Sequence, residues 1–241
     1  MSDKAPWSIR DCFMLFLIPW VVLPLILGIE ISVLGQAIPF LRPISEAFRK
    51  DNLAAGFVFS IIQVLAALAM LRYYLRRYRV RWRDLGLKSF NFVKAAAYIG
   101  ATFIALGFLV AAAFALVKVL LPNFNPNQAQ VNEFTTAVTP LARKISFLAL
   151  VILPPLIEEM VFRGFAFPAF SNRLGVVGGA LISSLLFGAA HLIGSGLNGA
   201  VYTMILGRLL CLLYRKLGSI WPGIALHMLN NYLAYLVIVG K

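Results

Sequence analysis

Charged residues are scarce in this 241-residue chain, and acidic residues are the scarcest of them. Asp, Glu, Lys and Arg together make up 13% of the sequence, against roughly 25% in soluble domains. Hydrophobic residues make up 61%, and the mean hydropathy is +0.87. The composition therefore argues against a soluble globular protein. Only nine Asp and Glu and two His are present, so each one inside an apolar stretch needs an explanation.

Cysteine is nearly absent as well, with only Cys12 and Cys211, both in or beside apolar stretches. Two cysteines are too few for the disulfide framework of a small secreted domain, so we expect buried thiols. The first apolar run, 12–29, resembles the start of a signal peptide. It is long, contains prolines and lacks a small-x-small cleavage site, which favours a retained first membrane span.

Long apolar runs are what the sequence has in abundance, and they predict an all-α, polytopic transmembrane helix bundle. A span needs about 20 apolar residues to cross the hydrocarbon core, and by that measure we expect about seven spans, within a range of six to eight. They are Cys12–Ile29, Leu53–Leu71, Phe92–Leu121, Ile145–Phe170, Val176–Ile193, Gly199–Tyr214 and Ile220–Val239. We expect one membrane domain, in which residues 1–90 hold the N-terminal spans and 92–241 the catalytic core, with its motifs within 145–239.

The net charge of +13 taken alone is typical of nucleic-acid binding, but the hydropathy argues against that partner. The segment 72–94 carries eight Lys and Arg against the single acid Asp84. The positive-inside rule therefore predicts a cytoplasmic segment and a cytoplasmic N-terminus. The turns at Arg173 and at 215–216 then also fall inside, and the loop 122–139, which has no Lys or Arg between its ends, falls outside. We expect a multi-pass protein of a bacterial plasma (inner) membrane. An amphipathic segment on anionic lipid is the alternative interpretation of 72–94.

Glu158, Glu159, Arg163, His191 and His227 all lie inside predicted spans. A charged group at the centre of a bilayer costs roughly 2.5 to 3.5 kcal/mol on insertion scales, so their clustering indicates a functional site. Aspartate is absent from every span core, which excludes a membrane aspartyl dyad. No H-E-x-x-H helix occurs either, and Ser195 lacks the G-x-S-G context of a membrane serine protease.

Helical spacing divides these residues into roles. Glu159 and Arg163 lie four residues apart in the order that favours an ion pair, and we expect them to give structural support. Glu158 is rotated by about 100° from Glu159 and is the carboxylate expected to face the bundle interior. His227 and Asn231 are also four residues apart and therefore share a helix face.

These residue types suit the hydrolysis of a peptide bond. A buried carboxylate near a histidine can hold and deprotonate a water, as Glu158 and His191 would do. A second histidine with an asparagine, here His227 and Asn231, can donate hydrogen bonds to a developing oxyanion. Glu158, His191 and His227 also match the ligand count of a catalytic zinc site. The spacing alone does not separate a zinc mechanism from a metal-free one.

Three motifs in order carry a resemblance to a known family. Residues 158–163 (EEMVFR) read as EExxxR, residues 187–191 (FGAAH) as FxxxH, and residues 227–231 (HMLNN) as HxxxN. The chain resembles the CPBP family of intramembrane proteases, also called the CAAX protease, bacteriocin-processing or Abi family, which is related to the type II CAAX prenyl endopeptidase. Residues 82–87 (WRDLGL) are similar to a sequence that commonly precedes the family core.

The resemblance implies an intramembrane endopeptidase. Glu158 and His191 match the pair that activates water, His227 and Asn231 match the oxyanion pair, and Glu159 with Arg163 completes the first motif. The implied substrate is a membrane-associated peptide or protein, either a CAAX tail or a small peptide such as a bacteriocin. The family is often labelled metalloprotease, so zinc and a metal-free mechanism both stay open. The alternatives are a non-catalytic scaffold or immunity protein and a proton-coupled transporter that uses Glu158 and His227.

The predicted spans raise one geometric condition. His191 falls near the end of its span, whereas Glu158 falls near mid-span. If the two share one water, the span of His191 must start later, tilt or dip.

Overall fold

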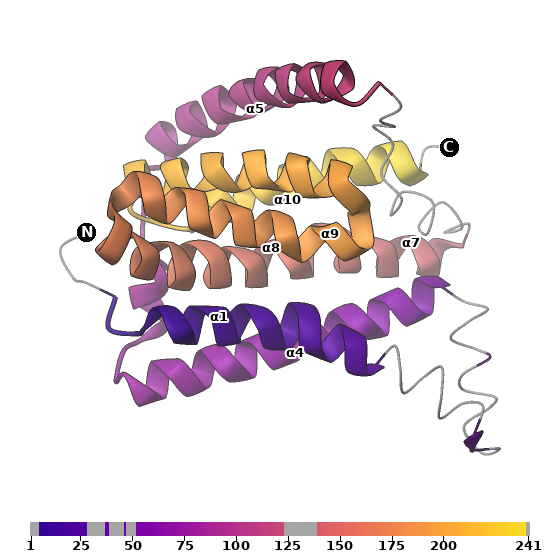
Figure 1. The fold of residues 1–241 in the computed structure, drawn as a ribbon, viewed down its shortest axis with the longest axis horizontal. Helices are drawn as coiled ribbons and strands as arrows, with labels where there is room; N and C mark the ends of the chain where they lie inside the picture. Colours follow the sequence, from indigo (N-terminus) through magenta and orange to yellow (C-terminus); the bar gives the residue numbers. More distant parts are fainter. Residues whose placement is uncertain (1–4, 28–36, 39–45, 47–51, 123–138, 240–241) are drawn as a thin grey trace.

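The computed structural model describes residues 5–27, 37–38, 46, 52–122 and 139–239 (Figure 1). All regular secondary structure in these ranges is helical, which confirms the predicted all-α fold. Residues 123–138 of the predicted outside loop 122–139 and the predicted end of the first span at Ile29 lie outside the described residues.

The described helices follow one another along the chain, and several of them run on from one to the next without a break. In order they are α1 (Ile9–Leu17), the π-helical turn η1 (Ile18–Val22), α4 (Asn52–Arg77), the short 3₁₀ helix η3 (Trp82–Leu85), α5 (Phe92–Leu120), α7 (Pro140–Phe147), the π-helical η4 (Leu148–Ile152), α8 (Leu153–Glu158), the π-helical η5 (Glu159–Ala166), α9 (Phe167–Leu217) and α10 (Trp221–Val239). Most of them run side by side along the long axis of the molecule (Figure 1).

Five helical stretches of the described chain are long and apolar enough to cross a membrane. They are Ile9–Leu27, Phe57–Arg77, Phe92–Leu120, Pro140–Leu192 and Gly194–Leu217. Large apolar side chains on their outer faces are exposed, as Phe92 (77%) and Phe108 (74%) are on α5, which suits contact with lipid rather than with water. The chain is an integral membrane protein.

Two glycines divide α9 into three helical parts. Gly175 has φ 70° and ψ 171°, and Gly196 has φ 66° and ψ −169°; neither conformation is helical. Both have the positive φ that glycine adopts without the steric cost of a side chain. The 53-residue stretch Pro140–Leu192 therefore contains two antiparallel helices rather than one. With this division and α10, the described helices agree with the prediction of about seven spans.

The turn at Gly175 places two of the predicted site residues at the same depth. Glu158 lies 17 residues before Gly175 and His191 lies 16 residues after it. Because the two helices are antiparallel and rise equally per residue, the side chains meet side by side. The predicted span 145–170 ends before the helix does, which is why Glu158 and His191 appear to lie at different depths in the sequence.

The part of this helix that follows Glu158 lies in the middle of the bundle. Every residue from Val161 to Phe170 is buried, with α1 and α4 on one side and α10 and α5 on the other (Figure 1). Trp7 stacks on Phe165 with ring centroids 4.3 Å apart, and its indole N–H donates to the Phe165 carbonyl at 2.8 Å. The central helix is therefore held by the N-terminal segment as well as by its neighbours.

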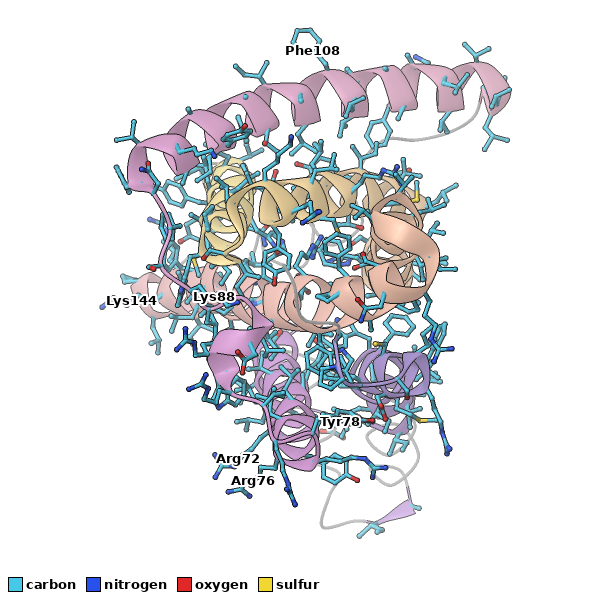
Figure 2. All side chains as sticks on the ribbon, turned by 90° about the vertical axis from the view of Figure 1, so that its left-hand side faces the viewer. Arg72, Arg76, Tyr78, Lys88, Phe108 and Lys144 are labelled. Atoms are coloured by element: carbon cyan, nitrogen blue, oxygen red, sulfur yellow. The ribbon has the colours of Figure 1, made fainter. Side chains whose placement is uncertain are left out.

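The basic segment and the predicted cytoplasmic turns gather at one end of the bundle. Arg72 and Arg76 project outward near the end of α4, away from the helices around the site (Figure 2). At the same end the amide of Ile220 donates to the carbonyl of Gly86 at 2.9 Å, which joins the segment 82–88 to the turn between α9 and α10. This arrangement agrees with the predicted topology, and the sidedness in the membrane stays a prediction.

Candidate active site

Glu158 is the last residue of α8 and lies between the π-helical segments η4 and η5. Single π-helical turns inside α-helices occur frequently at functional sites, because they alter which side chains share a face. Glu158 and Glu159 are both buried, at 6% and 0% exposure, and they point to opposite sides of one histidine, His227. Two adjacent carboxylates thus enter the bundle interior in different directions.

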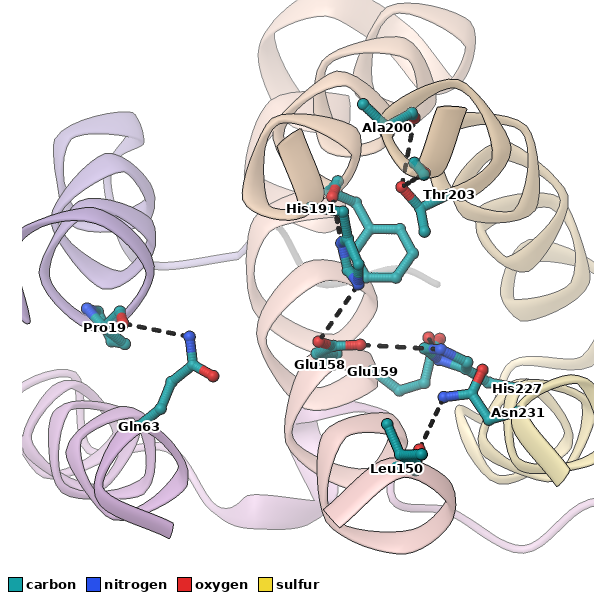
Figure 3. Close-up of polar contacts among 12 residues, drawn as sticks. Pro19, Gln63, Leu150, Glu158, Glu159, His191, Ala200, Thr203, His227 and Asn231 are labelled. Carbon is teal, nitrogen blue, oxygen red and sulfur yellow. Dashed lines mark hydrogen bonds and ion pairs between the residues drawn. The ribbon is translucent and has the colours of Figure 1, made fainter. Parts of the chain in front are cut away.

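Both histidines turn a ring nitrogen toward Glu158 (Figure 3). His191 Nε2 lies 3.9 Å from Glu158 Oε1, and His227 Nε2 lies 3.7 Å from Glu158 Oε2. These separations are too long for a direct hydrogen bond, and a polar contact beyond about 3.5 Å is of the kind that a water bridges. Glu158 Oε2 is also buried without a hydrogen-bond partner among the described residues. The two histidines therefore flank the Glu158 carboxylate, one at each oxygen, at separations that a water can bridge.

The far side of each imidazole ring fixes which nitrogen faces Glu158. His191 Nδ1 lies 2.9 Å from the carbonyl of Phe187, which can only accept, so Nδ1 carries the hydrogen. His227 Nδ1 lies 3.1 Å from Glu159 Oε1 and donates to that carboxylate. In each neutral ring, Nε2 is then an unprotonated base directed at Glu158. The Phe187 ring also contacts both imidazoles, with centroids 4.8 Å from His191 and 5.7 Å from His227.

Glu159 and Arg163 lie in contact, with Oε1 2.9 Å from Nη1 and both side chains 1% exposed. The Arg163 guanidinium also lies over the Phe187 ring, 4.3 Å from its centroid. The spacing of four residues predicts this pair. The sequence reasoning missed that the same carboxylate oxygen accepts from His227, so Glu159 and Arg163 support the orientation of His227 and not only the helix register.

The charges of this cluster indicate one shared proton. Two carboxylates and the Arg163 guanidinium leave a charge of −1 when both histidines are neutral. An uncompensated charge in a low-dielectric interior is costly. One further proton held among Glu158, His191 and His227 makes the cluster neutral. Groups that can each accept such a proton suit acid–base chemistry.

Asn231 lies one helical turn beyond His227 on α10. Its amide nitrogen donates to the carbonyl of Leu150 at 2.9 Å, and its amide oxygen accepts from Asn230 at 3.2 Å. Asn231 lies on the same cavity wall as His191 and His227. The structure therefore brings all four predicted catalytic residues to one place.

A cavity of about 520 Å³ opens on three of these residues, His191, His227 and Asn231. His191, His227 and Asn231 form its polar end, and Phe103 and Leu106 of α5 form part of its apolar wall. Volumes of roughly 300 to 1,000 Å³ are typical of ligand sites. Because α5 is largely exposed on its outer face, the apolar wall separates the site from lipid by one helix.

A zinc site is suggested by the donor atoms of Glu158, His191 and His227. The arrangement of these side chains gives a zinc site little support. No group of three His, Cys, Asp or Glu side chains in the described part of the chain is close enough to hold a metal ion. The orphaned Glu158 Oε2 is explained equally well by a water. We therefore derive no step through a metal.

Together the fold and the site define an integral membrane protein of the all-helical class with a buried Glu–His–His centre. Residues 140–233 match the family described as "Type II CAAX prenyl endopeptidase Rce1-like", which confirms the resemblance predicted from the three motifs over that part of the chain. A Bacillus subtilis (strain 168) protein named "Putative membrane peptidase YdiL" is 28% identical over 102 residues. That alignment covers 42% of this chain and 41% of the relative, so the likeness spans about two fifths of its length. No solved structure matches the chain.

Proposed function

We propose that this protein is an intramembrane endopeptidase that hydrolyses a peptide bond at or in the bilayer. The observation that carries the proposal is the convergence of His191 Nε2 and His227 Nε2 on the Glu158 carboxylate, beside a cavity that both histidines line. The family match over 140–233 and the name of the Bacillus subtilis relative support the same class of activity.

The proposed reaction uses these groups in two stages. A water held by Glu158 and His191 attacks the peptide carbonyl carbon while its proton passes to Glu158. The new oxyanion receives hydrogen bonds from protonated His227 and from the Asn231 amide. Donors are most effective when they are directed at the atom on which charge develops in the transition state. The C–N bond then breaks as the proton moves on to the leaving amine, and the carboxylate is restored.

The cavity indicates the class of substrate. Its polar end accommodates a peptide bond, and its apolar wall beside α5 suits an apolar chain that arrives from the bilayer. A membrane-associated peptide or protein fits both parts. A prenylated CAAX tail and a small bacteriocin-like peptide are the two substrate types to compare.

The proposal is tested in proteoliposomes with a farnesylated CAAX peptide and a non-prenylated membrane peptide as probes. We expect one probe to be cleaved by the wild type and the rate to fall by about 10² to 10⁴-fold in Glu158→Gln, the range typical of a general base. Glu46→Gln, which makes the same change in an exposed glutamate, serves as the matched control and should retain full activity. Equal cleavage by wild type and Glu158→Gln would contradict the proposal.

The same vesicles separate the other interpretations. A proton-coupled transporter would acidify or alkalinise the lumen without cleaving either peptide. A scaffold or immunity protein would do neither, and its partner binding would survive Glu158→Gln.

Metal dependence is a separate prediction. With water held only by Glu158 and the histidines, activity should persist after treatment with 1,10-phenanthroline and in protein found zinc-free by elemental analysis. Loss of activity on chelation, restored by added zinc, would favour the alternative in which Glu158, His191 and His227 hold the metal.

A further inference from the structure

We propose that Tyr202 and Asn230 are positioning residues of this site. With the main-chain carbonyl of Leu150, they form a hydrogen-bond chain that fixes the orientation of the Asn231 amide. None of the three is a fixed position of the motifs that predict the site. The inference rests on the proposed function, in which Asn231 donates to the oxyanion.

This hydrogen-bond chain starts at the Leu150 carbonyl, which has no main-chain donor within its own helix. In an α-helix the Leu150 carbonyl would accept from the amide of residue 154, and in a π-helix from that of residue 155. Pro154 and Pro155 occupy both positions, and proline has no N–H. The next candidate, the amide of Leu153, already donates to Leu148. The sequence therefore leaves this buried-side carbonyl free for a side chain.

Asn231 satisfies that carbonyl, and its orientation follows from the chemistry of the partner. A carbonyl oxygen only accepts, so the atom 2.9 Å from it must be Nδ2 of Asn231. Its Oδ1 then faces the other way and accepts from Asn230 Nδ2 at 3.2 Å. Asn230 Oδ1 in turn accepts the hydroxyl hydrogen of Tyr202. One acceptor-only group thus sets the direction of every bond in the chain.

This orientation matters for the proposed reaction. The Asn231 Nδ2 group has two hydrogens, and the Leu150 carbonyl uses one of them. The second is available to the cavity, on whose wall both Asn231 and His227 lie. If the amide turned over, it would present an acceptor oxygen to the oxyanion, which would repel it. Tyr202 and Asn230 act against that rotation by holding Oδ1.

Side-chain amide NMR of protein labelled with ¹⁵N-asparagine in detergent tests the orientation without any substrate. We expect an ordered Asn231 amide in the wild type and a marked loss of its order in Tyr202→Phe, in Asn230→Ala and in Pro154→Ala, which restores a competing N–H for Leu150. The amide of Asn172, which is exposed and donates to the Ala5 carbonyl, is the internal reference. An unchanged Asn231 signal in all three variants would overturn the proposal.

Kinetics with the cleaved probe give the second readout. Loss of one hydrogen bond that holds a catalytic group should lower kcat by about 10-fold and leave KM nearly unchanged, less than the roughly 10² to 10³-fold expected for loss of an oxyanion donor itself. Because Tyr202 acts through Asn230, the double variant should be no slower than Asn230→Ala alone. Tyr98 is a half-buried tyrosine of α5 that does not belong to the hydrogen-bond chain, so Tyr98→Phe should retain wild-type kcat.

The two proposals fail in different ways. Full activity of Glu158→Gln would overturn the proposed function and leave the NMR result to decide the hydrogen-bond chain. The positioning role alone would be overturned if Glu158→Gln lost activity while Tyr202→Phe and Asn230→Ala kept the wild-type kcat and the wild-type order of the Asn231 amide.

Discussion

At the scale of single residues, the site depends on two neighbouring carboxylates that do different work. Glu159 is tied to Arg163 and to His227 Nδ1, whereas Glu158 meets the Nε2 atoms of both histidines. The difference follows from a rotation of about 100° between successive helical residues. One carboxylate is thereby committed to holding a ring in place, and the other keeps an oxygen free for water.

Removing the cation from this cluster should destabilise the protein strongly. Arg163→Met leaves the buried Glu159 without its partner, and breaking a buried pair typically costs about 3 to 5 kcal/mol in the free energy of unfolding. The double variant with Glu159→Gln should recover part of this loss, because no unpaired charge is left. Denaturant unfolding in detergent measures both. Arg77→Met, which changes an exposed arginine, is the control, and a double variant no more stable than Arg163→Met would contradict this explanation.

Much of the residue-level site can be predicted from the sequence, because i, i+4 spacing and the rarity of intramembrane charge both point to it. The spacing identifies the Glu159 and Arg163 pair, and the scarcity of histidine points to His191 and His227. The contact between Glu159 and His227 depends on helix packing across 68 residues of sequence, which periodicity does not encode. The sequence does contain a signal for the free Leu150 carbonyl, because Pro154 and Pro155 have no N–H. It contains no signal for the role of Tyr202.

At the scale of elements, the central helix depends on a close contact with the segment that precedes α5. The Leu85 carbonyl lies 2.6 Å from where a Cβ on Gly164 would be, and Leu85 itself is fully buried. Residues 82–87, which the sequence analysis identified only by resemblance, thus pack directly on η5. A short loop motif outside the catalytic region positions the helix that carries both glutamates.

Gly164→Ala should therefore destabilise the bundle. The added methyl group must displace main-chain atoms at Leu85, and overpacking of this kind costs about 1 to 3 kcal/mol. Gly100→Ala on α5 is the matched control, because nothing lies within 4 Å of its added Cβ, and we expect it to be neutral or stabilising by up to about 1 kcal/mol. Equal thermal stability of the two variants in detergent would show that the contact with Leu85 is not tight.

Helix boundaries illustrate where sequence reasoning stops. Charges and turn residues mark the start of α5 at Phe92 correctly, since a long apolar run begins there. The helix of Glu158 extends past Phe170 to Gly175, because residues 171–174 continue the helix although they are polar or exposed. A polar last turn at a membrane surface resembles a loop in composition, so hydropathy alone ends the span too early.

At the scale of the whole molecule, the basic end of the bundle predicts the topology. The segment 72–94 and the turns at Arg173 and 215–216 lie at one end of the described helices, and the positive-inside rule assigns that end to the cytoplasm. Three basic residues belong to helix ends at the opposite end of the bundle: Lys118, Arg143 and Lys144. The bias of Lys and Arg toward the predicted cytoplasmic end is therefore strong but not complete.

Labelling with a membrane-impermeant maleimide in bacterial cells tests this orientation. Cys12 and Cys211 are buried, so the natural chain should give little background. Arg81→Cys should react only after the inner membrane is permeabilised, whereas Leu121→Cys, at the far end of α5, should react in spheroplasts with an intact inner membrane. The reverse pattern would place the N-terminus outside.

The most direct test of the account is whether Glu158 and His191 act on one water. Turnover of the cleaved probe peptide is measured for Glu158→Gln, His191→Ala and the double variant in the same vesicles. Residues that act as a unit give strongly non-additive losses, so the double variant should be about as slow as the slower single variant. Losses that multiply, or turnover close to wild type in Glu158→Gln, would contradict the account.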